Sequence, residues 1–248
     1  MRVLTYHRFG PSWHDPFCLD LADFEAQMAW LAKTQRAISL EALERFLKGQ
    51  QALPHSAVVV TIDDGYQSIR QALPILVKYQ IPAVVFLTVS KIRAADSEAL
   101  EPELPEPHLT WTDVKQLEAA GITVASHGWT HRSLGQMTWA ELEQEAKLSR
   151  AVLESHLVKP VRAFAYPFGT RADFNARTAA ALQDQYQLIF TSQHGAIQPG
   201  LSAAELPRIK VESGEPLWLF QLLTCGGLDA WGLIDQTLWR LQQTPAAS

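Results

Sequence analysis

The chain has 248 residues, of which 47% are hydrophobic and 19% are charged, a balance typical of a globular protein with a sizeable core. Its formal net charge of -5, with no long basic run, argues against a nucleic-acid partner. The two cysteines, Cys18 and Cys225, are too few for the disulfide framework that stabilises many small secreted domains.

The length and the first residues give two further expectations. We predict one domain over residues 1–248, because α/β barrels commonly use about 200 to 250 residues as a single unit. Met1 leads almost directly into an apolar strand, without the parts of a secretory signal, and no apolar run approaches about 18 residues. The sequence as written therefore predicts a cytoplasmic protein. An envelope protein whose leader had been removed from the sequence would look the same.

Seven short runs rich in β-branched or aromatic residues are predicted to be strands. In chain order they are Val3–Tyr6, Val58–Ile62, Ala83–Thr88, Ile122–Ala125, Ala163–Tyr166, Leu188–Thr191 and Leu206–Val211. Between most of them lie longer segments with apolar residues at helical spacing. This alternation predicts an α/β fold of mostly parallel strands joined by crossover helices.

Capping residues mark several of the intervening helices. Asp20 can cap the first helix, and Gly49 stops the second. Thr138 and Glu141 form a capping-box pattern before a long helix. The stretch 93–108 carries several prolines and acids without periodicity, so a surface loop is expected there.

The segment from about residue 216 to residue 243 is unusually rich in large apolar side chains, among them Trp218, Phe220, Trp231 and Trp239. We interpret it as helices that close the barrel. Contact with a membrane surface or with a second subunit is the alternative.

Two segments carry residues suited to metal chemistry. The apolar run 58–62 ends in Asp63 and Asp64, and a second apolar run is followed by His127 and His131. Each signal is weak alone, because an acid before glycine is a common turn and paired histidines occur on many surfaces. Parallel α/β folds, however, gather their chemistry where strands end. The combination favours a hydrolytic zinc-type centre with an open coordination position and a spare carboxylate.

Three segments resemble the motifs of a known family, the polysaccharide deacetylases with the NodB homology domain, also called carbohydrate esterase family 4. Thr61–Gly65 is similar to the T-F-D-D-G motif, Ser126–His131 to the S-H-x-x-x-H motif, and Arg162–Gly169 to the third motif. Their order and separation also fit, and the resemblance spans nearly the whole chain. It implies a NodB-type fold, a distorted (β/α) barrel of about seven mostly parallel strands.

The resemblance also implies roles for the residues of the first two motifs. Asp64, His127 and His131 would bind one divalent ion, with zinc expected and cobalt or nickel as possible substitutes. Asp63 would be the general base. A metal with three protein ligands keeps an exchangeable water, whose pKa can fall to about 7, and Asp63 could then take its proton.

The chain departs from the usual pattern at the catalytic acid. Most members carry this histidine in an L-x-H motif near the C-terminal end of the domain, and no such motif follows Arg208 here. Instead His7 ends the first predicted strand, as in the permuted branch that resembles the poly-N-acetylglucosamine deacetylases. We therefore predict His7 as the acid; a strand-end histidine bonded to a backbone carbonyl is the alternative.

The third motif of this chain has no arginine at the family's usual position. Arg162 and Arg208 are therefore both candidates for the residue that orients the base. By alignment on the motif's proline, Phe168 would offer its backbone N–H to the oxyanion. Tyr166 and Trp129 are predicted to line the sugar groove, although either could serve packing.

The function predicted from these residues is metal-dependent removal of the N-acetyl group from an N-acetylated amino sugar, in a polysaccharide, an oligosaccharide, or a lipid- or nucleotide-linked sugar. A hydrolase of small linear or cyclic amides or formamides would use the same centre. A carbohydrate-binding homologue without turnover is a third possibility, although all five predicted active-site residues are present.

Overall fold

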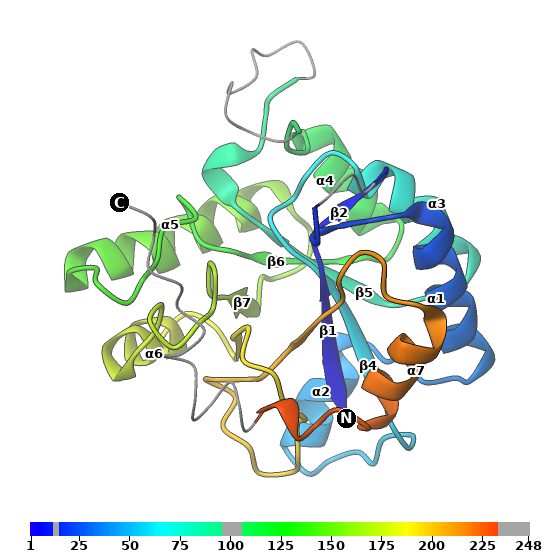
Figure 1. Cartoon of the computed structure of the whole chain (residues 1–248). Helices are drawn as coiled ribbons and strands as arrows, with labels where there is room; N and C mark the ends of the chain where they lie inside the picture. The colour runs from blue at the N-terminus through cyan, green and yellow to red at the C-terminus, as the bar shows by residue number, and fades with distance from the viewer. Residues whose placement is uncertain (12–14, 96–105, 233–248) are drawn as a thin grey trace, which may run out of the picture.

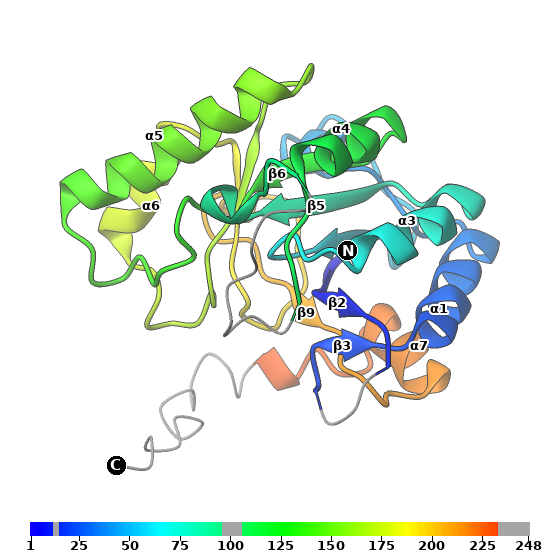
Figure 2. The same ribbon diagram turned by 90° about the horizontal axis from the view of Figure 1, so that it is seen from above.

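The computed structural model describes residues 1–11, 15–95 and 106–232. Seven parallel strands form one sheet that curls into a half-barrel, and the helices surround it (Figures 1 and 2). The order across the sheet is β8-β7-β6-β5-β4-β1-β9. The strands are β1 (Arg2–Tyr6), β4 (Val58–Ile62), β5 (Ala83–Leu87), β6 (Thr123–Ser126), β7 (Ala163–Ala165), β8 (Leu188–Phe190) and β9 (Ile209–Lys210). The predicted α/β barrel-like architecture is thus confirmed.

Seven α-helices are described. They are α1 (Leu21–Lys33), α2 (Leu40–Leu47), α3 (Ile69–Lys78), α4 (Trp111–Ala119), α5 (Trp139–His156), α6 (Ala176–Gln183) and α7 (Leu217–Cys225). The predicted caps are confirmed: the Asp20 carboxylate accepts the Ala22 N–H at 2.7 Å, and the capping box of Thr138 and Glu141 opens α5. A 3₁₀ turn, Val89–Lys91, follows β5, and a separate two-stranded sheet pairs β2 (Arg8–Phe9) with β3 (Cys18–Leu19).

The two edges of the curled sheet are joined by one stretch of chain. Leu206 bridges Phe190 of β8, and three residues later β9 begins to pair with β1. The predicted strand over residues 206–211 is therefore split between two partners, and only Ile209–Lys210 remains regular.

Alternation along the strands separates two hydrophobic clusters. In β4, Val58, Val60 and Ile62 face the outer helices, whereas Val59 faces the inside of the curl. The inner cluster is completed by Leu40 and Leu43 of α2. Because side chains two apart share a face of a strand, Thr61 and Asp63 continue the inward row of Val59. The inside of the half-barrel thus changes along β4 from apolar to polar.

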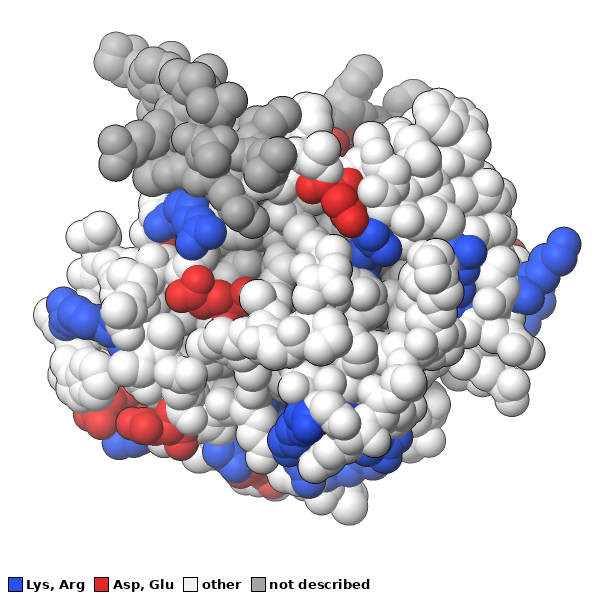
Figure 3. Space-filling view, turned by 90° about the horizontal axis from the view of Figure 1, so that it is seen from below, with Lys and Arg blue, Asp and Glu red and all other residues white. Residues whose placement is uncertain are grey.

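Part of the apolar C-terminal segment is described. Phe220 of α7 is buried, with its ring 5.8 Å from Trp30 of α1, whereas Trp218 and Trp231 are exposed. The predicted helices beyond residue 232 lie outside the described residues. In the described parts of the chain, no helix is both long and apolar enough to cross a membrane. The face seen from below carries basic and acidic side chains interspersed among uncharged ones (Figure 3).

Candidate active site

The two adjacent aspartates face one pocket because the chain turns sharply after β4. Asp63 continues the inward row of the strand and is 2% exposed. Asp64 has φ +71°, in the left-handed region that non-glycine residues rarely adopt. Gly65 follows with φ +82°, and a Cβ there would lie 2.7 Å from Leu87 Cδ2. The turn therefore needs glycine, and it brings the Asp64 carboxylate to the same side as Asp63.

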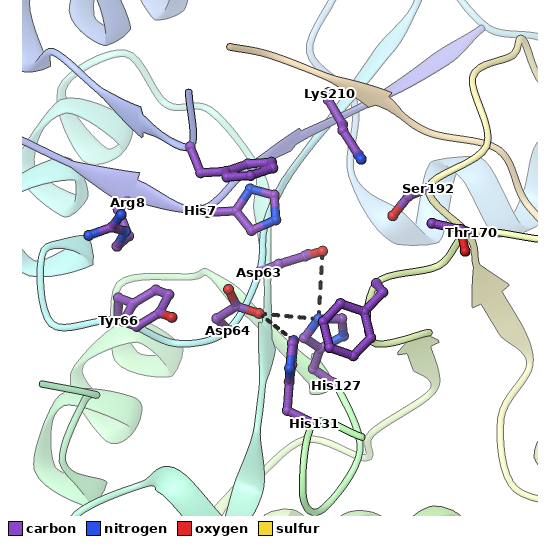
Figure 4. A pocket seen from close by; sticks show the side chains of 12 residues that line it. His7, Arg8, Asp63, Asp64, Tyr66, His127, His131, Thr170, Ser192 and Lys210 are labelled. Carbon is purple, nitrogen blue, oxygen red and sulfur yellow. Dashed lines mark ion pairs between the residues drawn. The ribbon is translucent and has the colours of Figure 1, made fainter. Parts of the chain in front are cut away.

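The predicted metal ligands converge at this turn. Asp64 Oδ1 lies 3.3 Å from His127 Nε2 and 3.0 Å from His131 Nε2 (Figure 4). His127 Nδ1 lies 2.8 Å from the carbonyl oxygen of Ala165, which can only accept. When the ring is neutral, Nδ1 therefore carries its proton, and the lone pair of Nε2 points toward Asp64.

The loop that carries His131 is held by a buried carboxylate from α5. Glu145 Oε2 accepts the backbone N–H of Trp129 at 2.6 Å and of Thr130 at 3.1 Å, and Oε1 accepts the Thr130 hydroxyl. Gly128 passes so close that a Cβ would lie 2.9 Å from Glu145 Oε2. His131 itself has φ +61°. Three residues of the site, Asp64, His131 and Phe168, thus have positive φ, as strained functional sites often do.

The three ligand atoms fit a divalent cation. All lie within 4.8 Å of one another, as one oxygen and two imidazole nitrogens. Asp64 Oδ1 is buried and makes no hydrogen bond of normal geometry within the described residues, as expected of an oxygen aimed at a common point with two nitrogen lone pairs. Burial disfavours the Asp64 carboxylate, but its interactions with the adjacent His127 and His131 outweigh burial and hold the pKa of Asp64 well below its usual value.

Arg208 holds the second carboxylate. Its Nη1 and Nη2 each lie 2.7 Å from one oxygen of Asp63, and its Nε donates to the Thr191 carbonyl at 2.8 Å. Arg208 is 1% exposed. Burial alone would raise the pKa of Asp63, but the charge of Arg208, followed by that of His127, lowers it. Asp63 is therefore an ionised carboxylate held rigidly in place, with Oδ2 3.9 Å from His127 Nε2.

His7 lines the same pocket from the end of β1. Its ring packs edge-on against Phe17, with ring centroids 4.9 Å apart. Burial lowers the pKa of His7 despite the opposing charges of Asp64 and Asp63. Phe168 also lines the pocket, with φ +60°, and the centroid of its ring lies 4.9 Å from that of His131.

Three predicted positions lie elsewhere. Arg162 stands just before β7, at the opposite end of the sheet, and its half-exposed side chain lies 3.7 Å from Glu44. Tyr166 is fully buried and stacks on Phe174, because alternation turns it to the outer face of the sheet. Trp129 packs against the outer core cluster and is not among the residues that line the pocket. The groove role predicted for Tyr166 and the orienting role considered for Arg162 do not fit these positions, whereas the groove role of half-buried Trp129 stays a prediction.

The sequence reading missed several residues of the pocket, which has a volume of about 320 Å³. Phe17 lines it together with the predicted groups. So do four residues that Figure 4 labels: Arg8, Tyr66, Ser192 and Lys210. Burial, followed by the charge of Asp64, raises the pKa of Tyr66 to about 12, so its hydroxyl stays protonated and can donate. Alternation from Arg208 was the signal that could have found Lys210, two residues further along.

The fold and the pocket agree with the class of hydrolases that the three motifs predicted. The polysaccharide deacetylase family matches residues 50–188, more than half of the chain, so the chain belongs to this family.

The chain is similar to three proteins of known name or structure. The poly-beta-1,6-N-acetyl-D-glucosamine N-deacetylase of Staphylococcus epidermidis is 26% identical over 197 residues, covering 77% of this chain and 67% of that protein. The structure of IcaB from Ammonifex degensii has 26% identity and a TM-score of 0.74, covering 90% of this chain and 95% of that one. A polysaccharide deacetylase from Bacillus cereus has 26% identity and a TM-score of 0.75, covering 90% of this chain and 68% of that one.

Proposed function

We propose that this protein is a divalent-metal-dependent deacetylase that hydrolyses the acetamido group of an N-acetylated amino sugar. The observation that carries the proposal is the convergence of Asp64, His127 and His131 beside an ionised Asp63. The similarity to an N-acetylglucosamine polymer deacetylase supports the sugar as substrate.

A divalent cation held by Asp64, His127 and His131, with zinc expected, would supply a Lewis acid for the acetyl carbonyl and for the attacking water. Asp63 takes the proton of that water, because Arg208 fixes its orientation and keeps it ionised. Phe168 donates its backbone N–H to the carbonyl oxygen as negative charge develops there.

His7 completes the reaction by giving a proton to the departing nitrogen. The C–N bond then breaks, and the products are acetate and the free amine. Burial lowers the pKa of His7, so once protonated the ring releases its proton readily. The edge contact with Phe17 fixes the plane of the ring.

The proposal is tested by measuring acetate released from N-acetylglucosamine oligomers by protein treated with chelator and then loaded with zinc or cobalt. We expect turnover only with metal. Asp64→Asn should lose both metal and activity, whereas Asp63→Asn should keep the metal and lose activity. Release of formate from simple formamides, with no acetate from any sugar, would favour the small-amide alternative. Sugar binding without release of acetate by metal-loaded protein would contradict the proposal.

A further inference from the structure

Lys210 places a cation on the inner wall of the pocket. Arg208 and Lys210 are two residues apart, so both side chains project from the same face of the chain at β9. The guanidinium of Arg208 is already bonded to Asp63. Lys210 lies two residues further toward the C-terminal end of β9, where it pairs in register with Thr5 of β1. Figure 4 shows Lys210 and Arg8 on opposite sides of His7.

Lys210 differs from the other charged residues of the pocket because its side chain has no charged partner among the residues that the structure describes. Arg8 forms an ion pair with Asp15, and Asp63 forms one with Arg208. Within the described residues, the side chain of Lys210 makes no hydrogen bond or ion pair, and its ammonium lies 5.9 Å from the ring centroid of Phe17. With Asp63 neutralised by Arg208 and Asp64 engaged by the two histidines, this ammonium is a positive charge left for a ligand.

Lys210 also stands between two cavities. It lines the pocket of about 320 Å³ and an adjoining cavity of about 400 Å³, and Ser192 is the other pocket residue shared by both. The first volume is at the lower end of the range for small-molecule sites, about 300–1,000 Å³. A substituent that leads from a sugar in the pocket toward the adjoining cavity therefore passes the ammonium of Lys210 and the hydroxyl of Ser192.

We propose that Lys210 is a specificity-determining residue that recognises an anionic group, a phosphate or a carboxylate, carried by the N-acetylated sugar. This inference deepens the proposed function and rests on it for the identity of the sugar. The adjoining cavity also contains Glu212 and Glu215, so the anion is expected at the shared wall rather than deeper in that cavity. A neutral acetamido sugar would leave the Lys210 ammonium without a partner.

The test compares binding and turnover of matched sugars. Metal-loaded protein is titrated calorimetrically with N-acetylglucosamine, its 1-phosphate, its 6-phosphate and N-acetylglucosaminuronic acid. The variants are Lys210→Gln, Lys210→Arg and, as a control of equal charge change, Lys33→Gln, which alters an exposed residue that lines neither cavity. Acetate release is followed with the same sugars.

We expect at least one anionic sugar to bind about 10- to 100-fold more tightly than the neutral one, as a hydrogen bond to a charged group allows. Lys210→Gln should remove this preference, Lys210→Arg should keep most of it, and Lys33→Gln should not change it. The kcat for the neutral sugar should be unaffected by Lys33→Gln. Which sugar shows the preference identifies phosphate or carboxylate as the anion.

Several results would overturn the inference: no preference in the unmodified protein, a preference that survives Lys210→Gln, an equal loss for neutral and anionic sugars, or no sugar binding at all. The two proposals fail separately. Binding that depends on Lys210 without acetate release would contradict the deacetylase proposal but not the anion site. Acetate release without a preference for anionic sugars would contradict the anion site but not the deacetylase proposal.

Discussion

Replacing Arg208 with methionine should destabilise the protein strongly, because it leaves Asp63 charged and buried without its partner. The two contacts of 2.7 Å are hydrogen bonds between charged groups, worth about 1.5–3 kcal/mol each, or about 3–6 kcal/mol together. Breaking one side of a buried ion pair typically costs about 3–5 kcal/mol. For a chain of this size the melting temperature should fall by about 6–20 °C.

The assay is urea and thermal unfolding of the metal-free protein, with three companion variants. Arg162→Met removes an exposed arginine whose ion pair is long, and it should cost less than about 1 kcal/mol. The double variant Asp63→Asn, Arg208→Met leaves no bare charge and should be more stable than Arg208→Met alone. Arg208→Lys keeps a positive charge but cannot make two parallel hydrogen bonds to Asp63, so its stability should lie between those of the unmodified protein and Arg208→Met.

The pH dependence of the same measurement gives an independent check. Arg208 lowers the pKa of Asp63 in the folded protein. The stabilisation of the fold by this ion pair is therefore complete above 3.8, the pKa of Asp63 in the unfolded chain, and is lost as the pH falls through the lower pKa of the folded protein. The stability difference between the unmodified protein and Arg208→Met should therefore shrink in acid. A cost below about 1 kcal/mol at neutral pH, with no gain from the second substitution, would refute the reasoning.

Three other predictions concern the metal and the acid. His7→Gln should lower kcat by about 10²- to 10⁴-fold while the protein still binds zinc, measured by acetate release and metal analysis; loss of the metal would contradict the role of His7. Glu145→Gln should weaken zinc binding by about 10- to 100-fold in a chelator competition, because Glu145 holds the loop of His131, whereas the exposed neighbouring substitution Glu143→Gln should have no effect. Although burial alone would lower it, the charges of Asp63 and Asp64 raise the pKa of His127, so in the metal-free protein a proton competes with zinc for Nε2. Zinc affinity should then fall as the pH drops through that raised value, and zinc binding should release a proton. A zinc affinity that stays the same from about pH 5 to pH 8 would disprove the competition.

The sequence was sufficient to predict the elements and the core of the candidate site, because both depend on local patterns. The predicted bounds of β4 agree residue for residue with the structure, and Asp64, His127 and His131 meet because each follows the carboxyl end of a parallel strand. The order of strands across the sheet is not a local property. The choice between Arg162 and Arg208 required knowing that β9 lies beside β1.

The error at Tyr166 has a different cause, since the alternation needed to avoid it was present in the sequence. Ala163 and Ala165 face the inside of the curl, so Phe164 and Tyr166 must face the outer helices. The small two-stranded sheet of β2 and β3, which brings Phe17 to His7, was not predicted because strands of two residues leave no periodic pattern.

The position of β1 between β4 and β9 has a consequence for how the protein is made. Among the strands of this sheet β1 leaves the ribosome first, but one of its edges stays open until the residues of β9 have been synthesised. Until then the nascent chain exposes an unpaired strand edge, a known route to aggregation, and the Asp63 carboxylate has no guanidinium. A chain released before Arg208 would lack both the closing strand and the neutralising charge, so quality control by chaperones and proteases should discriminate sharply between full-length and prematurely terminated products.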